Sequence, residues 1–102
     1  MAKILAMINL DQKTQGEISA ELASRVRARR KEQGLSQAEL AERSGVSLGS
    51  LKRFEQVHEI SLSSFVKLLM TLGYDGDLDA LLARRSYRSI DEVIADARAR
   101  RA

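Results

Sequence analysis

Polar and basic side chains gather between Gln37 and Arg53 of the 102-residue chain. The amide of Gln37, the hydroxyl of Ser50 and the cations of Lys52 and Arg53 all donate hydrogen bonds. Such donors suit phosphate oxygens and the edges of base pairs. Arg53 is of special interest, because a guanidinium can bind O6 and N7 of guanine together, a contact worth about 1–3 kcal/mol of discrimination. We expect Ser50 and Lys52 to hold phosphates instead.

Two short helices joined by a tight turn must position these side chains. Ser36 and Glu39 have the spacing of a capping box, which predicts a helix from Gln37. Gly45 is placed to end that helix, because glycine enters a left-handed conformation without steric cost. Ser47 then caps a second helix. The expected inner positions are Ala38, Leu40, Ala41, Val46, Leu51 and Phe54.

This order of elements resembles the helix-turn-helix of lambda repressor/Cro-type transcriptional regulators, the XRE family. The resemblance extends from about Leu22 to Gly73, and its matching residues are Gln37, Ala41, Gly45, Val46, Leu51 and Phe54. It implies an all-α fold, a five-helix lambda-repressor-like DNA-binding domain, to which the chain adds an N-terminal arm and a short C-terminal amphipathic helix.

The resemblance also implies roles for individual residues. Arg30 and Glu55 occupy the positions of a structural ion pair between the first helix and the recognition helix. Leu48 and Gly49 depart from the family, which often has hydrogen-bonding side chains there. Sequence specificity is therefore expected to depend more on Arg53, on DNA shape and on dimer spacing. The DNA-binding candidates are Gln37, which the family places at a phosphate, and Ser47, Leu48, Gly49, Ser50, Lys52 and Arg53.

Composition excludes several classes of site. The chain has no Cys, and His58 is its only histidine, so neither a thiolate zinc site nor a histidine-based metal site or triad is expected. No nucleophile–base pair or phosphate loop stands out, and we expect no cofactor and no enzymatic activity. The net charge of +3 is concentrated in two basic runs, which favour an anionic partner, although a solvated helix face is the alternative. These runs are Arg25, Arg27, Arg29, Arg30 and Lys31, and Arg98, Arg100 and Arg101.

The chain divides into three segments: an arm over residues 1–16, a helix-turn-helix domain over 17–83 and an extension over 84–102. The arm alternates apolar residues as a strand would, and also fits a helix. It either pairs with its copy in a dimer or docks on its own domain. No run is long enough for a signal peptide or a membrane span, so we expect a soluble, cytoplasmic protein without a membrane partner.

Apolar spacing predicts four helices besides the two of the helix-turn-helix. One precedes them and covers 17–33. Two follow them: one is capped by Ser61 and ends at Gly73, and the next comes after the acidic segment 75–79. A final amphipathic helix starts near Ser89 and Glu92, and a mobile basic end follows it. The expected core positions are Ile18, Leu22, Ala23, Val26 and Ala28, then Leu62, Phe65, Val66, Leu68, Leu69 and Leu72, then Leu78, Leu81 and Leu82, and on the last helix Ile90, Val93, Ile94 and Ala97.

These features favour a sequence-specific repressor that binds double-stranded DNA as a homodimer on a palindromic operator. Small size and a C-terminal extension also resemble HipB-like antitoxins, which repress their own operon and hold a kinase-like toxin. The alternative is a protein-interaction adaptor, or an antitoxin, in which the helical domain is a scaffold and DNA binding is secondary.

Overall fold

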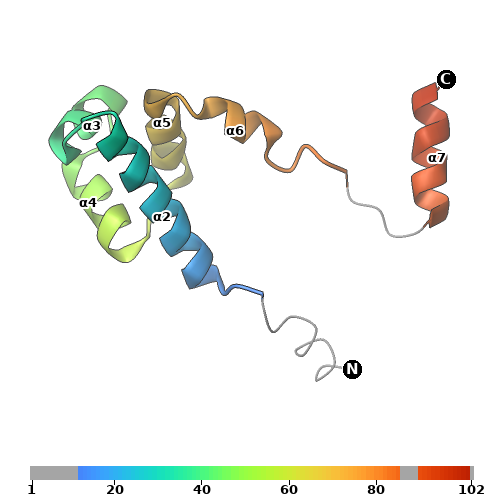
Figure 1. The fold of residues 1–102 in the computed structure, drawn as a ribbon, viewed down its shortest axis with the longest axis horizontal. Helices are drawn as coiled ribbons and strands as arrows, with labels where there is room; N and C mark the ends of the chain where they lie inside the picture. The colour runs from blue at the N-terminus through green and yellow to red at the C-terminus, as the bar shows by residue number, and fades with distance from the viewer. Residues whose placement is uncertain (1–11, 86–89, 102) are drawn as a thin grey trace.

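A computed structural model describes residues 12–85 and 90–101 of the chain. It confirms the all-α fold, with every regular element of that part helical (Figure 1). None of the described helices is both long and apolar enough to span a membrane. In chain order the helices are α2 (Gln15–Glu32), α3 (Gln37–Ser44), α4 (Leu48–Val57), α5 (Leu62–Leu72), α6 (Asp75–Ala80) and α7 (Ile90–Arg101).

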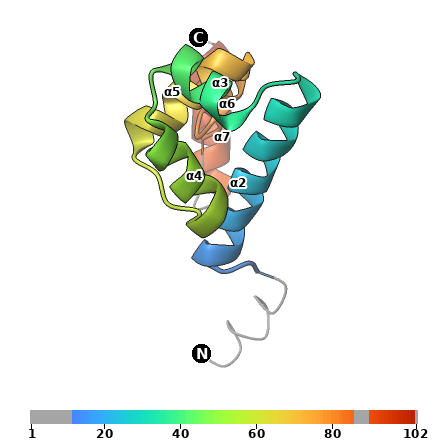
Figure 2. The same cartoon turned by 90° about the vertical axis from the view of Figure 1, so that its left-hand side faces the viewer.

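Helices α2 to α5 enclose one small core. α3 packs against α4 and α5, and α2 packs against the same two helices from the other side (Figure 2). The most deeply buried leucines are Leu40, Leu51 and Leu68, one from each of α3, α4 and α5. Around them lie Ala23, Val26, Leu35, Ala41, Val46, Phe54 and Leu72.

The helix-turn-helix forms as its caps predict. Ser36 Oγ accepts from the backbone N–H of Glu39 at 3.0 Å, and Glu39 Oε1 accepts from the backbone N–H of Ser36 at 3.0 Å. Gly45 has a φ of +74°, the left-handed conformation that a residue with a side chain adopts at a cost. Ser47 then accepts from the N–H of Ser50 at 3.1 Å and starts α4. Two capped ends and one glycine therefore fix the angle between α3 and α4.

The first helix begins earlier than expected. α2 starts at Gln15 instead of Glu17, because Thr14 and Glu17 form a second capping box. The expected boundary between residues 16 and 17 falls inside this Thr-x-x-Glu motif and separates Thr14 from Glu17. Of the residues expected on the inner face of α2, Ala23 and Val26 are buried, whereas Ile18 and Leu22 are 47% and 37% exposed.

Four more residues of the domain that were expected in the core are exposed. Ala38 is exposed, because α3 turns Leu40 and Ala41 inward instead. Leu62, the first residue of α5, lies outside the core at 76% exposed. Leu81 and Leu82 are exposed as well, because the fifth helix, α6, is formed by the acidic segment itself and ends at Ala80. Asp75 and Asp77 lie in its first turn, where carboxylates interact favourably with the helix dipole.

The C-terminal helix is longer than expected. α7 continues to Arg101, so the basic residues expected to form a mobile end are part of the helix. Asp96 pairs with Arg85 before the helix and with Arg100 one turn later. Figure 1 shows α7 apart from the other helices, with Ile94 exposed. The expected cap at Ser89 and most of the expected arm, residues 1–11, lie outside the described residues.

Candidate nucleic-acid interface

One side of α4 packs into the core, and the opposite side faces outward. Leu51 is fully buried, and Phe54 is 3% exposed and meets the edge of Phe65 with ring centroids 5.8 Å apart. Because residues at helical spacing share one face, positions 48, 49, 52 and 53 are on the outer face of α4. Leu48 is 37% exposed there, and Lys52 and Arg53 are exposed.

The start of α4 carries small and polar candidates. Ser47 is the N-cap, and its hydroxyl also donates to Ser50 Oγ at 2.8 Å. Apart from its chain neighbours and the backbone of its own helix, Gly49 has no atom within 4 Å of the place where a Cβ would stand. Neither the glycine nor its surroundings therefore obstruct a close approach by another molecule to this end of the helix.

Arg30 of α2 and Glu55 of α4 form the ion pair that the resemblance implies. Arg30 Nε and Nη2 donate to the two carboxylate oxygens of Glu55, each at 2.9 Å, and Nη1 donates to the carbonyl of Leu35 at 2.9 Å. The two side chains are only 8% and 5% exposed. A buried guanidinium with these partners ties the end of α2 to the last turn of α4.

Gln37 lies beside this ion pair. Its amide donates to Glu55 Oε1 at 3.1 Å, and Arg27 Nε lies 4.0 Å from the same oxygen. A polar hollow of about 480 Å³ opens here and is lined in part by Gln37, Glu55 and Gln56. In this structure the Gln37 amide, which was expected at a phosphate, fixes the orientation of α3 relative to α4.

Arg53 has a partner that the sequence did not indicate. Its Nη2 donates to Glu59 Oε2 at 2.7 Å, although both side chains are exposed, at 64% and 68%. The pairing depends on the chain reversing after α4, where His58 adopts a left-handed φ of +66°. No sequence spacing signals such a contact, because an arginine on a helix and a glutamate six positions later normally lie on different faces.

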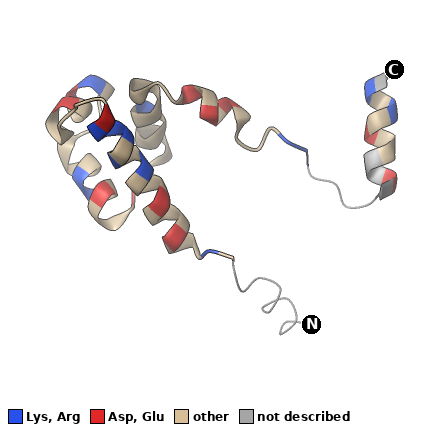
Figure 3. Cartoon of the chain, in the orientation of Figure 1, with Lys and Arg blue, Asp and Glu red and all other residues tan. Residues whose placement is uncertain are grey.

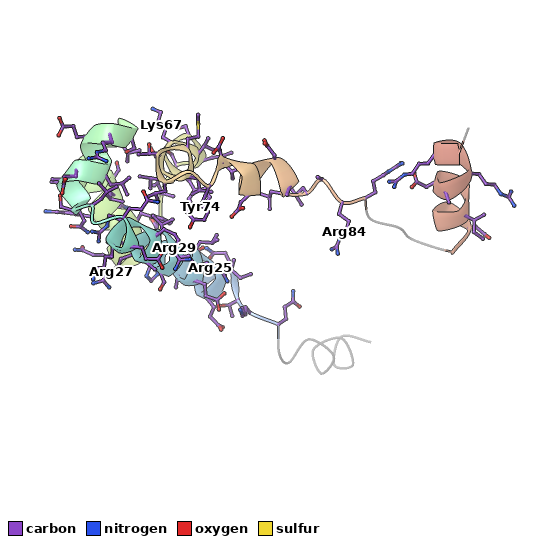
Figure 4. All side chains as sticks on the ribbon, turned by 45° about the horizontal axis from the view of Figure 1, so that its top comes forward. Arg25, Arg27, Arg29, Lys67, Tyr74 and Arg84 are labelled. Atoms are coloured by element: carbon purple, nitrogen blue, oxygen red, sulfur yellow. The ribbon has the colours of Figure 1, made fainter. Side chains whose placement is uncertain are left out.

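The basic run of α2 is largely paired with acids of the same chain. Arg25 lies 3.8 Å from Glu21, Arg29 is 2.8 Å from Glu32, and Arg30 is buried against Glu55. Figure 3 shows acidic positions in the first half of α2 and basic ones in the second, which ends on the acidic Glu32, and Figure 4 shows Arg25, Arg27 and Arg29 along that helix. The run therefore does not act as one free cationic stripe.

Local donors also shift the acidity of two carboxyl groups. The backbone N–H of Ser36, and then its hydroxyl, lower the pKa of Glu39 below its ordinary 4.5. A hydrogen bond from Lys13 lowers the pKa of Glu21 in the same way. Both groups are therefore ionised at neutral pH. The Glu39 carboxylate caps the first turn of α3, and the Glu21 carboxylate pairs with Lys13, which precedes α2.

Comparison with known proteins agrees with this geometry. The family model described as helix-turn-helix matches residues 26–78, which is more than half of the chain. No curated protein and no solved structure gives a significant match.

Proposed function

Because the chain belongs to the helix-turn-helix family of lambda repressor/Cro-type transcription regulators, we propose that it is a sequence-specific repressor acting as a dimer on a palindromic operator. DNA binding and transcription regulation follow from the family itself. The dimer, the operator symmetry and the roles of individual residues are our proposal. The observation that carries it is the outer face of α4, which is held from behind by Leu51, Phe54 and the Arg30–Glu55 pair.

In this proposal α4 enters the major groove. Arg53 contacts a guanine, and Ser50 and Lys52 hold phosphates. Ser47, Leu48 and Gly49 bring the backbone close to the bases, and Leu48 contacts a thymine methyl group. Gln37 reaches a phosphate next to the N-terminus of α3, whose free N–H groups favour an anion. Since Gln37 donates to Glu55 in the free structure, phosphate binding has to share or replace that hydrogen bond.

A dimer supplies the affinity that one small domain lacks. Each subunit would occupy one half-site, with the two half-sites about one helical turn, roughly 34 Å, apart. Support for a protein contact comes from an apolar groove of about 320 Å³ between α2, α5 and α6, beside the exposed Leu22 and Leu81. Its apolar lining includes Val26, Phe65, Leu69, Leu72, Tyr74 and Leu78. Figure 4 shows Tyr74 at the junction of α5 and α6.

The segments outside the core also enter the proposal. We retain the arm before α2 as a dimer contact and the extension after residue 83 as a docking segment. Removing residues 1–10 and measuring the molar mass by light scattering tests the arm. An unchanged dimer would exclude the arm as its main contact.

The same groove favours a second candidate, an adaptor or antitoxin that uses the domain as a scaffold. Its apolar lining and the exposed Ile94 of α7 suit a protein partner such as a toxin. Lys52 and Arg53 on the outer face of α4 favour the repressor.

Selection of bound duplexes from a random pool separates these candidates. The selected duplex and a scrambled control are then titrated at two salt concentrations. An inverted repeat with a large affinity gap over the control supports the dimeric repressor. Equal, salt-sensitive binding to both duplexes indicates a general basic surface and favours the scaffold.

A further inference from the structure

The ion pair between Arg53 and Glu59 lies on the proposed DNA-facing side of the domain. We infer that Glu59 is a positioning residue for sequence recognition, which holds the Arg53 guanidinium ready for a guanine and opposes its use on phosphates. The inference rests on the proposed function, because it concerns the same recognition helix. The main observation behind it is the 2.7 Å hydrogen bond that Arg53 Nη2 donates to Glu59 Oε2.

The backbone fixes Glu59 more firmly than its exposure suggests. α4 ends at Val57, and the His58 N–H donates to the carbonyl of Phe54 at 2.9 Å. His58 then turns the chain through its left-handed conformation, and Ile60 packs against the core. Glu59 therefore stands on a short loop that is held at both ends, one by the helix cap and one by the core.

This contact adds little to the stability of the fold. Exposed ion pairs add little to folding, because water screens them and two long side chains must be ordered. The contact does have a use in DNA recognition. A carboxylate on one guanidinium nitrogen restricts the rotation of the arginine, and the other N–H groups remain available for O6 and N7 of a guanine.

The surroundings of the Arg53–Glu59 pair also support a role for Glu59 in recognition. A hollow of about 330 Å³ beside it is lined by Arg53 and Glu59 with Ser50, Ile60, Ser61 and Ser64. Without Glu59, the hydroxyls and the guanidinium would form a general anion site that any phosphate could fill. The Glu59 carboxylate places a negative charge beside the Arg53 guanidinium, so a phosphate that approaches this guanidinium is repelled while a neutral base edge is not.

The test measures discrimination, which is the dissociation constant of the scrambled duplex divided by that of the selected one. Glu59→Ala should lower this ratio about fivefold, the lower end of what one two-point arginine–guanine contact supplies. Glu59→Gln retains an acceptor oxygen without the charge, and should keep more of the ratio than Glu59→Ala. In an Arg53→Ala background, Glu59→Ala should leave the ratio unchanged, because no guanidinium remains to be positioned.

Asp79→Ala is the matched control. It removes an exposed carboxylate from α6, on a different element from the ion pair. It should leave the ratio unchanged, and any shared effect of net charge is then subtracted. Thermal unfolding of each variant checks that the fold is retained.

Two outcomes overturn the inference while leaving the proposed function intact. In one, Glu59→Ala tightens binding to both duplexes equally, which is simple charge repulsion. In the other, it changes the ratio by the same factor with and without Arg53. If the wild-type protein shows no preference for any duplex, both the inference and the proposed repressor fail together.

Discussion

Arg30 and Glu55 are 25 positions apart in the chain, yet their charged groups meet through two hydrogen bonds of 2.9 Å. The pair is buried and links the end of the first domain helix to the end of the helix proposed to read DNA. Its value for stability depends on both partners, because either charge left alone would be buried without its main partner.

Arg30→Ala should lower the free energy of unfolding by about 3–5 kcal/mol, since Glu55 would lose its cation. Urea denaturation measures this loss. The double variant Arg30→Met with Glu55→Leu should recover most of it, because no unpaired charge then remains. A loss below about 1 kcal/mol for the single variant would place the pair among ordinary exposed ion pairs.

Arg53→Ala and Lys52→Ala should separate base reading from phosphate binding. The arginine variant should relax the preference for the selected duplex by about 1–3 kcal/mol. The lysine variant should weaken binding to all duplexes similarly and reduce the slope of log K against log salt by about 1. Titrations at several salt concentrations check both, and equal losses on every sequence for both variants would refute the assigned roles.

Leu68→Ala and Leu62→Ala form a matched pair on α5. Leu68 is fully buried and Leu62 is 76% exposed. The first substitution should cost about 2–5 kcal/mol through lost burial and a cavity. The second should change stability by no more than about 0.5 kcal/mol. Denaturant unfolding measures both, and a large loss at Leu62 would mean that this residue is covered in solution.

Gly49→Ala should stabilise the domain by about 0.5–1 kcal/mol, because alanine loses less backbone freedom than glycine in a helix. Apart from its chain neighbours and its own helix backbone, the added Cβ meets no atom within 4 Å. Chemical denaturation measures the gain. If Gly49 lies close to DNA, affinity for the selected duplex should fall while stability rises, and a loss of both would contradict the open surroundings of this residue.

Glu39→Gln tests the charged cap of α3. Hydrogen bonds from Ser36 hold the pKa of Glu39 below 4.5, so its charge stabilises the fold above that pH. The stabilisation is lost as pH falls through the lowered folded value. The variant should therefore melt below the wild type at pH 7 and converge with it in acid. Melting curves from pH 7 to pH 3 check this, and a constant difference would mean that the charge does not contribute.

Much of the fold was predictable, because local signals and tertiary packing agree in its centre. Ser36, Glu39, Gly45 and Ser47 each act within a few residues of their partners, and such short-range contacts leave a spacing in the sequence. The errors lie where two signals compete. Leu62 begins α5 and Leu82 follows the end of α6, and the burial of such apolar residues depends on the direction that the chain takes next to them.

The candidate site was predictable only on its helix. The outer positions of α4 follow from helical spacing and from the buried Leu51 and Phe54. The Arg53–Glu59 contact depends on one left-handed residue, His58, whose type does not favour that conformation as strongly as glycine does. A contact made by a chain reversal leaves no periodic trace.

The anchoring of α4 from one side has an evolutionary consequence. Its core residues and the Arg30–Glu55 pair fix the helix without using positions 48, 49, 52 or 53. Those four positions can therefore change while the scaffold persists. Under the proposed function, a lineage that duplicates this gene can give each copy a new target by a few substitutions, and a laboratory library confined to the same positions can search for new targets without rebuilding the fold.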